Sequence, residues 1–229
     1  MSSSSSAAKL ARADDLKATV EALSDGTLTA RAYCESCLAR VRASEAVIKA
    51  WVVLDEDRAR AIAATRDVRD AQGSLHGIPV GVKDLFDTDD LPTEMGSPAF
   101  VGNQPAKNAQ VVERIVAAGG YALGKTVTTE FAFMHPAETR NPWNPRHTPG
   151  GSSSGSAAAV AAGHVPVAIG TQTNGSVIRP AAYCGVVGFK PTLDTLPIQG
   201  ALPFAQTLDH VGVFARSVAD ARLLHRVPR

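Results

Sequence analysis

The sequence predicts an α/β fold in which a mixed, mainly parallel sheet is covered by helices. Short apolar runs that are typical of buried strands alternate along the chain with stretches of helical periodicity. Hydrophobic residues make up 45% of the chain and charged residues 20%, as in ordinary globular proteins. The 229 residues suffice for one sizeable core, and no stretch has the composition of an interdomain linker.

The first part of the chain is predicted to contain three helices and one strand. Residues 9–23 and 28–43 carry apolar side chains at spacings of three and four, which indicates amphipathic helices separated by a turn at Asp25-Gly26. The apolar run 50–54 predicts a buried strand, and residues 56–71 follow as a third helix.

The middle of the chain continues the alternation. Residues 76–84 predict a strand that ends in charged residues. Residues 109–118 predict a helix that stops at Gly119-Gly120, because glycine commonly ends helices, and the run 121–123 then predicts a short strand. Prolines, glycines and hydroxyl residues make the stretch 141–155 turn-rich.

The last predicted elements are a helix of small residues and two strands. Residues 157–162 form the helix, and Ser156 is placed to cap it. The apolar runs 165–169 and 185–189 predict the strands.

The first residues of the chain differ in composition from the rest. Residues 1–7 are expected to be a disordered, serine-rich tail, and residues 8–229 to form a single α/β domain. The tail lacks a basic segment followed by an apolar stretch, so it does not resemble a secretory signal. The apolar run 157–170 is shorter than the roughly 20 residues of a membrane helix. No membrane contact is therefore expected, and the odd number of cysteines indicates a reducing, cytoplasmic setting.

Charge and cysteine content exclude several functions. The formal net charge is +1 and aromatic residues make up 5%, which argues against direct nucleic-acid binding. Three cysteines do not make a disulfide framework. Cys34 and Cys37 fall on the apolar face of one predicted helix without a second pair, so we interpret them as core residues rather than metal ligands. No motif requires a metal or a cofactor.

Residues 119–126 match the P-loop pattern that binds nucleotide phosphates. That chemistry needs a strand before the first glycine and a helix after the lysine. Here a helical pattern precedes Gly119, and β-branched residues follow Lys125. The context therefore favours a helix end and a strand over a nucleotide site.

Two serine-rich loops and one lysine indicate a catalytic site. Glycines surround the serines in 148–156 and again in 170–176, and a serine beside glycines on a sharp turn exposes its hydroxyl among free N–H groups. A serine nucleophile needs a base, and none of the six histidines lies in a convincing motif. Lys83 follows the apolar run 78–82, where partial burial would lower its pKa enough for a Ser–Lys arrangement.

Taken together, these motifs resemble the amidase signature family. The matching stretches are HGIPVGVKD at 76–84, LGKT at 123–126 with TEF at 129–131, NPWN at 141–144, and the two serine loops. The resemblance covers about residues 50–225. It implies the family's α/β fold, an amidase activity toward linear amides and a small-molecule amide as the substrate.

The resemblance also implies a Ser–Ser–Lys triad. Lys83 matches the family's lysine, Ser152 its bridging serine with a cis peptide bond, and Ser176 its nucleophile. Hydrolysis of the amide C–N bond would then pass through an acyl-enzyme. Backbone N–H groups of Thr173, Asn174, Gly175 and Ser176 would form the oxyanion hole, and Ser153 matches a supporting serine.

Two departures from the family pattern affect the second loop. Gln172 replaces an aspartate and keeps hydrogen-bonding ability without the charge. Asn174 replaces a glycine, and asparagine tolerates the left-handed backbone better than most residues.

Met95, Phe131, Phe133 and Met134 either line a pocket or belong to the core, and their apolar spacing favours the core.

Length leaves other functions open. Family members usually continue well beyond residue 229, so the resemblance implies a fold that is incomplete at its C-terminus. The alternatives to an amide hydrolase are a non-catalytic truncated remnant that only binds or assembles, and one component of an amidotransferase. The sequence does not decide the oligomeric state, for which a homodimer stays open.

Overall fold

A six-stranded sheet forms the centre of the protein. The computed structural model describes residues 15–67 and 73–227. The strands lie in the order β1-β3-β2-β4-β6-β5. Their bounds are β1 (Trp51–Val53), β2 (Pro79–Lys83), β3 (Tyr121–Thr126), β4 (Val167–Gln172), β5 (Val187–Phe189) and β6 (His210–Ala215).

The sheet is mixed, with a parallel centre. β2 pairs in parallel with β3 and with β4, whereas β1 and β6 pair antiparallel with their neighbours. Because β5 is antiparallel to β6, four of the six strands run in one direction: β2, β3, β4 and β5. The prediction of a mixed, mainly parallel sheet covered by helices is confirmed.

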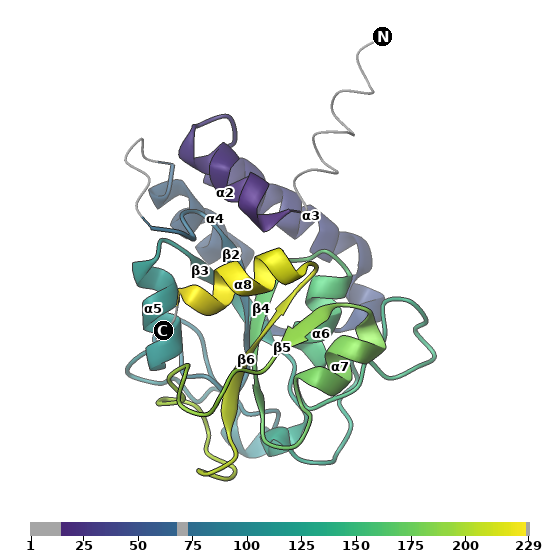
Figure 1. Ribbon diagram of the computed structural model, residues 1–229. Helices are drawn as coiled ribbons and strands as arrows, with labels where there is room; N and C mark the ends of the chain where they lie inside the picture. The colour runs from purple at the N-terminus through teal and green to yellow at the C-terminus, as the bar shows by residue number, and fades with distance from the viewer. Residues whose placement is uncertain (1–14, 68–72, 228–229) are drawn as a thin grey trace.

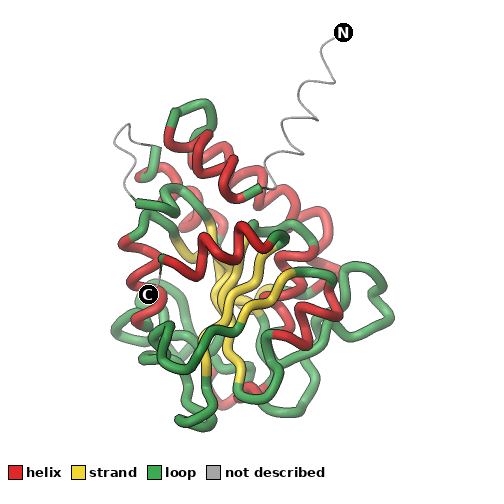
Figure 2. Tube along the Cα trace, in the orientation of Figure 1, coloured by secondary structure: helices red, strands yellow, loops and turns green. Residues whose placement is uncertain are grey.

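Helices cover both faces of this sheet. Their bounds are α2 (Leu16–Ser24), α3 (Ala30–Ile48), α4 (Glu56–Thr65), α5 (Gln110–Ala117), α6 (Ser154–Ala161), α7 (Ile178–Cys184) and α8 (Val218–Arg226), with short 3-10 turns η1 (Pro98–Phe100) and η2 (Glu130–Ala132). In Figure 1, α8 crosses the front of the strands, and α6 packs behind them. Figure 2 shows the strands enclosed between helical layers.

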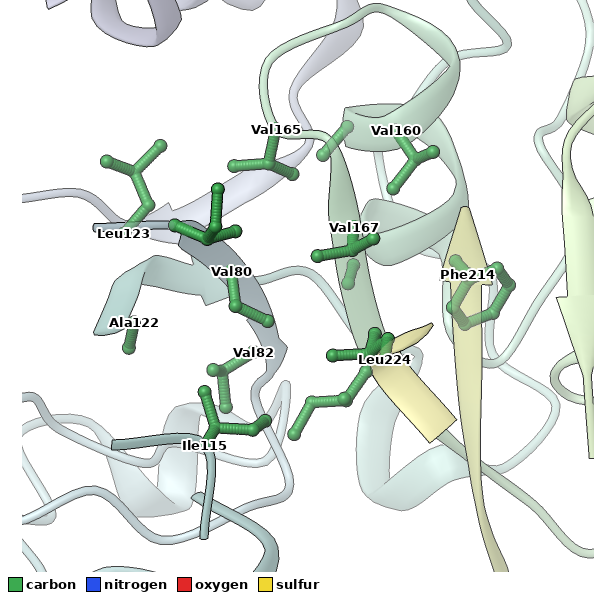
Figure 3. Close-up of a cluster of buried hydrophobic side chains, with 14 of the residues drawn as sticks. Val80, Val82, Ile115, Ala122, Leu123, Val160, Val165, Val167, Phe214 and Leu224 are labelled. Carbon is green, nitrogen blue, oxygen red and sulfur yellow. The ribbon is translucent and has the colours of Figure 1, made fainter. Parts of the chain in front are cut away.

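The alternation of side chains along β2 assigns different tasks to its two faces. Successive side chains of a strand point to opposite faces of the sheet. Val80 and Val82 enter the core, and Figure 3 shows Val82 beside Ile115 of α5 and Leu224 of α8. Lys83, one residue after Val82, therefore points to the opposite face, on which α6 packs.

Several predicted elements differ from the observed ones at their ends. α3 continues to Ile48 beyond the predicted end at residue 43, and β3 and β4 extend to Thr126 and Gln172. α2 begins at Leu16, so residues 9–14 of the first predicted helix lie outside the described residues, as does the tail at 1–7. α4 ends at Thr65, and residues 68–71 of its predicted range also lie outside them.

The predicted capping role of Ser156 is wrong. α6 begins at Ser154, and Ser153 occupies the N-cap position without a side-chain capping bond. Ser156 lies inside the helix, where its Oγ is 2.7 Å from Thr126 Oγ1 and donates to Ile169 O at 3.0 Å. It fastens α6 to the sheet instead.

The P-loop interpretation fails as expected. α5 precedes Gly119, and β3 contains Lys125. The Lys125 side chain is fully buried and donates to Phe86 O at 2.9 Å and to Thr93 Oγ1 at 2.6 Å. An ammonium engaged in this way holds the segment after β2 and is not available to a phosphate.

The cysteines are core residues, as predicted. Cys34 and Cys37 lie on the buried face of α3, and both are free thiols, as is the buried Cys184 of α7. None of the helices within the described ranges has the length and apolar character needed to cross a bilayer.

We expect Gly155→Ala to disrupt the docking of α6. A Cβ at this position would lie 2.2 Å from Ala50 O and 2.3 Å from Val127 N, both of them backbone atoms that cannot swing aside. The free energy of unfolding should fall by about 3 kcal/mol, measured by urea denaturation. Gly26→Ala is the control: a Cβ there meets nothing within 4 Å, so only the strain of its left-handed backbone, about 1 kcal/mol, is expected. A loss at Gly155 no larger than that at Gly26 would contradict the observed packing.

Candidate active site

The ε-amine of Lys83 is buried at the end of the central strand β2. Its exposed fraction is 0%. The amine donates to Ser152 Oγ at 2.7 Å and to Thr171 Oγ1 at 2.8 Å. Because β2 and β4 are parallel neighbours, their carboxyl ends meet at one edge of the sheet, which brings Lys83 and Thr171 together.

Burial determines the charge state of this amine. Desolvation lowers the pKa of Lys83 well below its ordinary value of 10.5, and the Asp209 carboxylate acts in the opposite direction. Within the described ranges no carboxylate lies at ion-pair distance from the amine, and its two partners are uncharged hydroxyls. The neutral form is therefore favoured, and a neutral amine can accept a proton.

The serine loop before α6 reaches the amine through Ser152. The peptide bond between Gly151 and Ser152 is cis, as the family resemblance implied. Ser152 is 2% exposed and Ser153 is fully buried. Ser153 Oγ donates to Thr171 O at 3.2 Å, which fastens the loop to the end of β4.

The second loop presents Ser176 at a turn closed by Gln172. The Gln172 side-chain oxygen accepts hydrogen bonds from the N–H groups of Val177 at 2.9 Å and Ile178 at 3.0 Å. The replacement noted in the sequence thus keeps an acceptor at this position. Asn174 has no left-handed backbone, so its tolerance of that conformation is not used; the positive φ of this loop, +128°, belongs to Gly175.

Backbone and side-chain bonds hold the two loops against each other. Ser153 N donates to Ser176 O at 3.3 Å, and Arg179 Nη1 donates to Gly151 O at 3.1 Å. Ser152 and Ser176 line the same cavity. No hydrogen bond recorded for the described residues joins their two hydroxyls, so the structure connects Lys83 with Ser152 and places Ser176 on the same cavity as Ser152.

The N–H groups of the second loop have no acceptor outside the sheet ladder among the described residues. In the described part of the chain, no hydrogen bond has the N–H of Thr173, Asn174, Gly175 or Ser176 as its donor outside the sheet ladder. Free N–H groups at a turn can hold a developing oxyanion. The predicted oxyanion hole therefore stays a prediction for which the donors are present.

The cavity beside Ser176 has a volume of about 370 Å³. Its walls include exposed apolar side chains, and Arg179 is the one cation among the described residues that line it. Phe133 and Met134 belong to these walls, with exposed fractions of 61% and 77%, so the expectation that they are core residues is wrong. Met95 and Phe131 are half-buried.

The chain matches known proteins along most of its length. The family model described as Amidase matches residues 32–228. This chain belongs to the amidase family. It is 45% identical over 216 residues to a glutamyl-tRNA(Gln) amidotransferase subunit of Chloroflexus aurantiacus, in a match that covers 90% of this chain and 44% of that relative.

Solved structures of the amidase family agree with the fold. The peptide amidase from Stenotrophomonas maltophilia is 35% identical, with a TM-score of 0.86, and the match covers 93% of this chain and 47% of that one. The corresponding glutamyl-tRNA(Gln) amidotransferase subunit from Thermotoga maritima is also 35% identical, with a TM-score of 0.75, over 85% and 42%. The chain thus spans less than half the length of these relatives.

Two residues of this amidase-family site carry no signal of their own in the sequence. Thr171 is the second partner of Lys83, and Asp209 accepts a hydrogen bond from Thr173 Oγ1 at 2.5 Å. Thr171 ends an apolar run as an ordinary strand residue. Asp209 is 33 positions beyond Ser176, and the pairing of β4 with β6 that brings it back was not predicted.

Lys83→Met should make stability less dependent on pH. Between the lowered pKa of Lys83 and 10.5, the unfolded chain binds a proton that the folded chain does not, so the free energy of unfolding rises with pH. The wild-type value minus that of Lys83→Met should increase by up to about 1.4 kcal/mol per pH unit between about pH 7 and 9. Urea denaturation at both pH values measures it. A constant difference would mean that the buried amine keeps its proton.

Proposed function

We propose that this chain carries the centre that hydrolyses a carboxylic amide C–N bond through a Ser176–Ser152–Lys83 triad. One observation carries the proposal: a fully buried lysine amine lies 2.7 Å from Ser152 Oγ, in a loop that shares a cavity with Ser176. A structural lysine gains stability from a carboxylate partner or from solvent, and this amine has neither among the described residues. A proton acceptor explains why it is kept there.

The proposed acylation starts at Ser176. The lone pair of neutral Lys83 takes the proton of Ser152, and Ser152 Oγ takes that of Ser176. Ser176 Oγ then bonds to the amide carbon, and the carbonyl oxygen becomes an oxyanion. The N–H groups of residues 173–176 stabilise this charge, and one such donor contributes about 2.7–4 kcal/mol in comparable sites.

The second half returns the proton and regenerates the serine. As the C–N bond breaks, the proton passes back through Ser152 to the leaving nitrogen, and the amine or ammonia departs. Ser176 then holds the acyl group as an ester. Water attacks that ester with the same relay as its base, which releases the carboxylic acid and restores Ser176 Oγ–H.

A second candidate is the amidase component of an amidotransferase. The 45% identity to a relative with that name supports it, whereas the higher TM-score belongs to the peptide amidase. Both candidates cleave an amide at the same serine. They differ in the fate of ammonia, which an amidotransferase delivers to an acceptor and a hydrolase releases to water. A non-catalytic remnant that only binds or assembles predicts no covalent chemistry at Ser176.

Ser176→Ala should abolish hydrolysis, with a loss of at least about 10³-fold in kcat, because it removes the nucleophile. The measurement is a screen of small aliphatic and aromatic amides with the 229-residue chain and with any longer polypeptide that contains it. Lys83→Ala should be comparably inactive. Ser24→Ala, an exposed serine at the end of α2, is the control and should retain full activity.

A fluorophosphonate probe separates the catalytic from the non-catalytic alternatives without a known substrate. Labelling of the wild-type chain at Ser176, found by peptide mass spectrometry and absent from Ser176→Ala and Lys83→Ala, is the expected result. Labelling at another serine, or equal labelling in Lys83→Ala, would overturn the triad. Glutaminase activity that appears only with a partner protein would favour the amidotransferase.

A further inference from the structure

Asp209 stands at the junction of two segments that enclose the cavity beside Ser176. Its exposed fraction is 8%. One carboxylate oxygen accepts from Thr173 Oγ1 at 2.5 Å. The other accepts from the backbone N–H groups of Phe204 and Ala205, both at 2.7 Å. The Asp209 carboxylate therefore accepts three short hydrogen bonds and joins Thr173 to the segment of Phe204 and Ala205.

Strand pairing explains why these residues meet. β4 and β6 are antiparallel, and Gln172 is the pairing partner of His210. Thr173 directly follows Gln172, and Asp209 directly precedes His210, so the two lie opposite each other where the ladder ends. The sheet itself therefore delivers the carboxylate to the first residue of the loop that carries Ser176.

The two segments held by Asp209 have different roles at the cavity. Thr173 begins the run of residues whose N–H groups have no acceptor outside the sheet ladder in the described part of the chain, and it lines the cavity. Phe204 lines the cavity from another segment and stacks on Phe133, with ring centroids 5.7 Å apart. Loss of the carboxylate would release both at once.

Gln172 and Asp209 fasten different ends of the same loop. The Gln172 side chain binds the N–H groups of Val177 and Ile178, after Ser176. The start of the loop has Thr173 Oγ1 as its one side-chain tether among the described residues. Without this tether, the side chains of the loop would fix only its far end, and the first residue after the ladder could rotate and turn its N–H group away.

We infer that Asp209 is a positioning residue, which through Thr173 orients the loop N–H groups at 173–176 toward the carbonyl oxygen of the substrate. The inference rests on the proposed amide hydrolysis at Ser176. Oxyanion stabilisation depends on donors that are oriented before the reaction, so a loosened loop start lowers kcat more than it weakens substrate binding.

Substitutions at Thr173 test the inference with little change to the core. Thr173→Val removes the hydroxyl at nearly constant volume and should lower kcat by about 10- to 100-fold, with KM changed by less than about threefold. Thr173→Ser keeps the hydroxyl and should restore kcat to within about threefold of the wild type. Asp209→Ala should lower kcat at least as much as Thr173→Val.

Thr27→Val is the matched control. Thr27 Oγ1 donates to Asp25 Oδ1 at 2.6 Å, an equivalent Thr–Asp bond in the exposed turn between α2 and α3. This variant should leave kcat unchanged. A loss of kcat in Thr173→Ser equal to that in Thr173→Val, or no loss in either, would overturn the role of the bond.

Hydrogen exchange supplies a readout that does not need activity. Mass spectrometry of peptides spanning 170–180 should show at least about fivefold faster exchange of their hydrogen-bonded amides, which include those of Val177 and Ile178, in Thr173→Val and Asp209→Ala, and wild-type rates in Thr173→Ser and Thr27→Val. If the wild-type chain hydrolyses no amide while these exchange differences appear, the proposed function fails and the positioning of the loop by Asp209 stands. Unchanged exchange in Asp209→Ala refutes the positioning role whatever the activity.

Discussion

The site depends on the removal of one amine from water. Lys83 is fully buried between two hydroxyls, and the described residues supply no carboxylate partner for it. Burial of a charged ammonium is costly, so the folded chain favours the neutral amine. The surrounding elements keep the amine away from water: β4 provides Thr171, the loop before α6 provides Ser152, and α6 packs against β2 and β4.

A second buried lysine shows that the partners decide the outcome. Lys125 lies on β3, next to β2, and is also fully buried. It pairs with Asp84 at 3.4 Å and donates to backbone carbonyls. Burial lowers its pKa to about 8, and the Asp84 carboxylate offsets part of that effect. Lys125 is suited to holding structure as a cation, whereas Lys83 is suited to accepting a proton.

The sequence predicts the parts of the candidate site that local chemistry marks. The apolar run before Lys83 singles out that lysine, and the glycines single out the two serine loops. The chain order of helix and strand is enough to reject the P-loop at Lys125. Each of these inferences depends only on residues that are close together in the sequence.

The parts that depend on strand neighbours were not predictable in this way. α7 was also not predicted, because Pro180 suggests a break in a helix. Proline is nevertheless tolerated in the first turn of a helix, where Pro180 lies. β6 and α8 were not predicted, and the contacts of Asp209 and Thr171 were missed with them. A single chain records which residues alternate along a strand but not which strand lies beside it, and Asp209 meets Thr173 only when β6 pairs with β4.

One face of β2 packs in the core and the other carries Lys83, which limits the insertions and deletions that this strand can accept. Val82 and Lys83 are consecutive, and their side chains lie on opposite faces of the sheet. Insertion of one residue within β2 would place the Val82 side chain against the hydroxyls of Ser152 and Thr171. It would also turn the Lys83 amine into the apolar core. Two inserted residues would restore the alternation but displace the strand by about 7 Å. Length variation among descendants should therefore be confined to the connections outside residues 79–83.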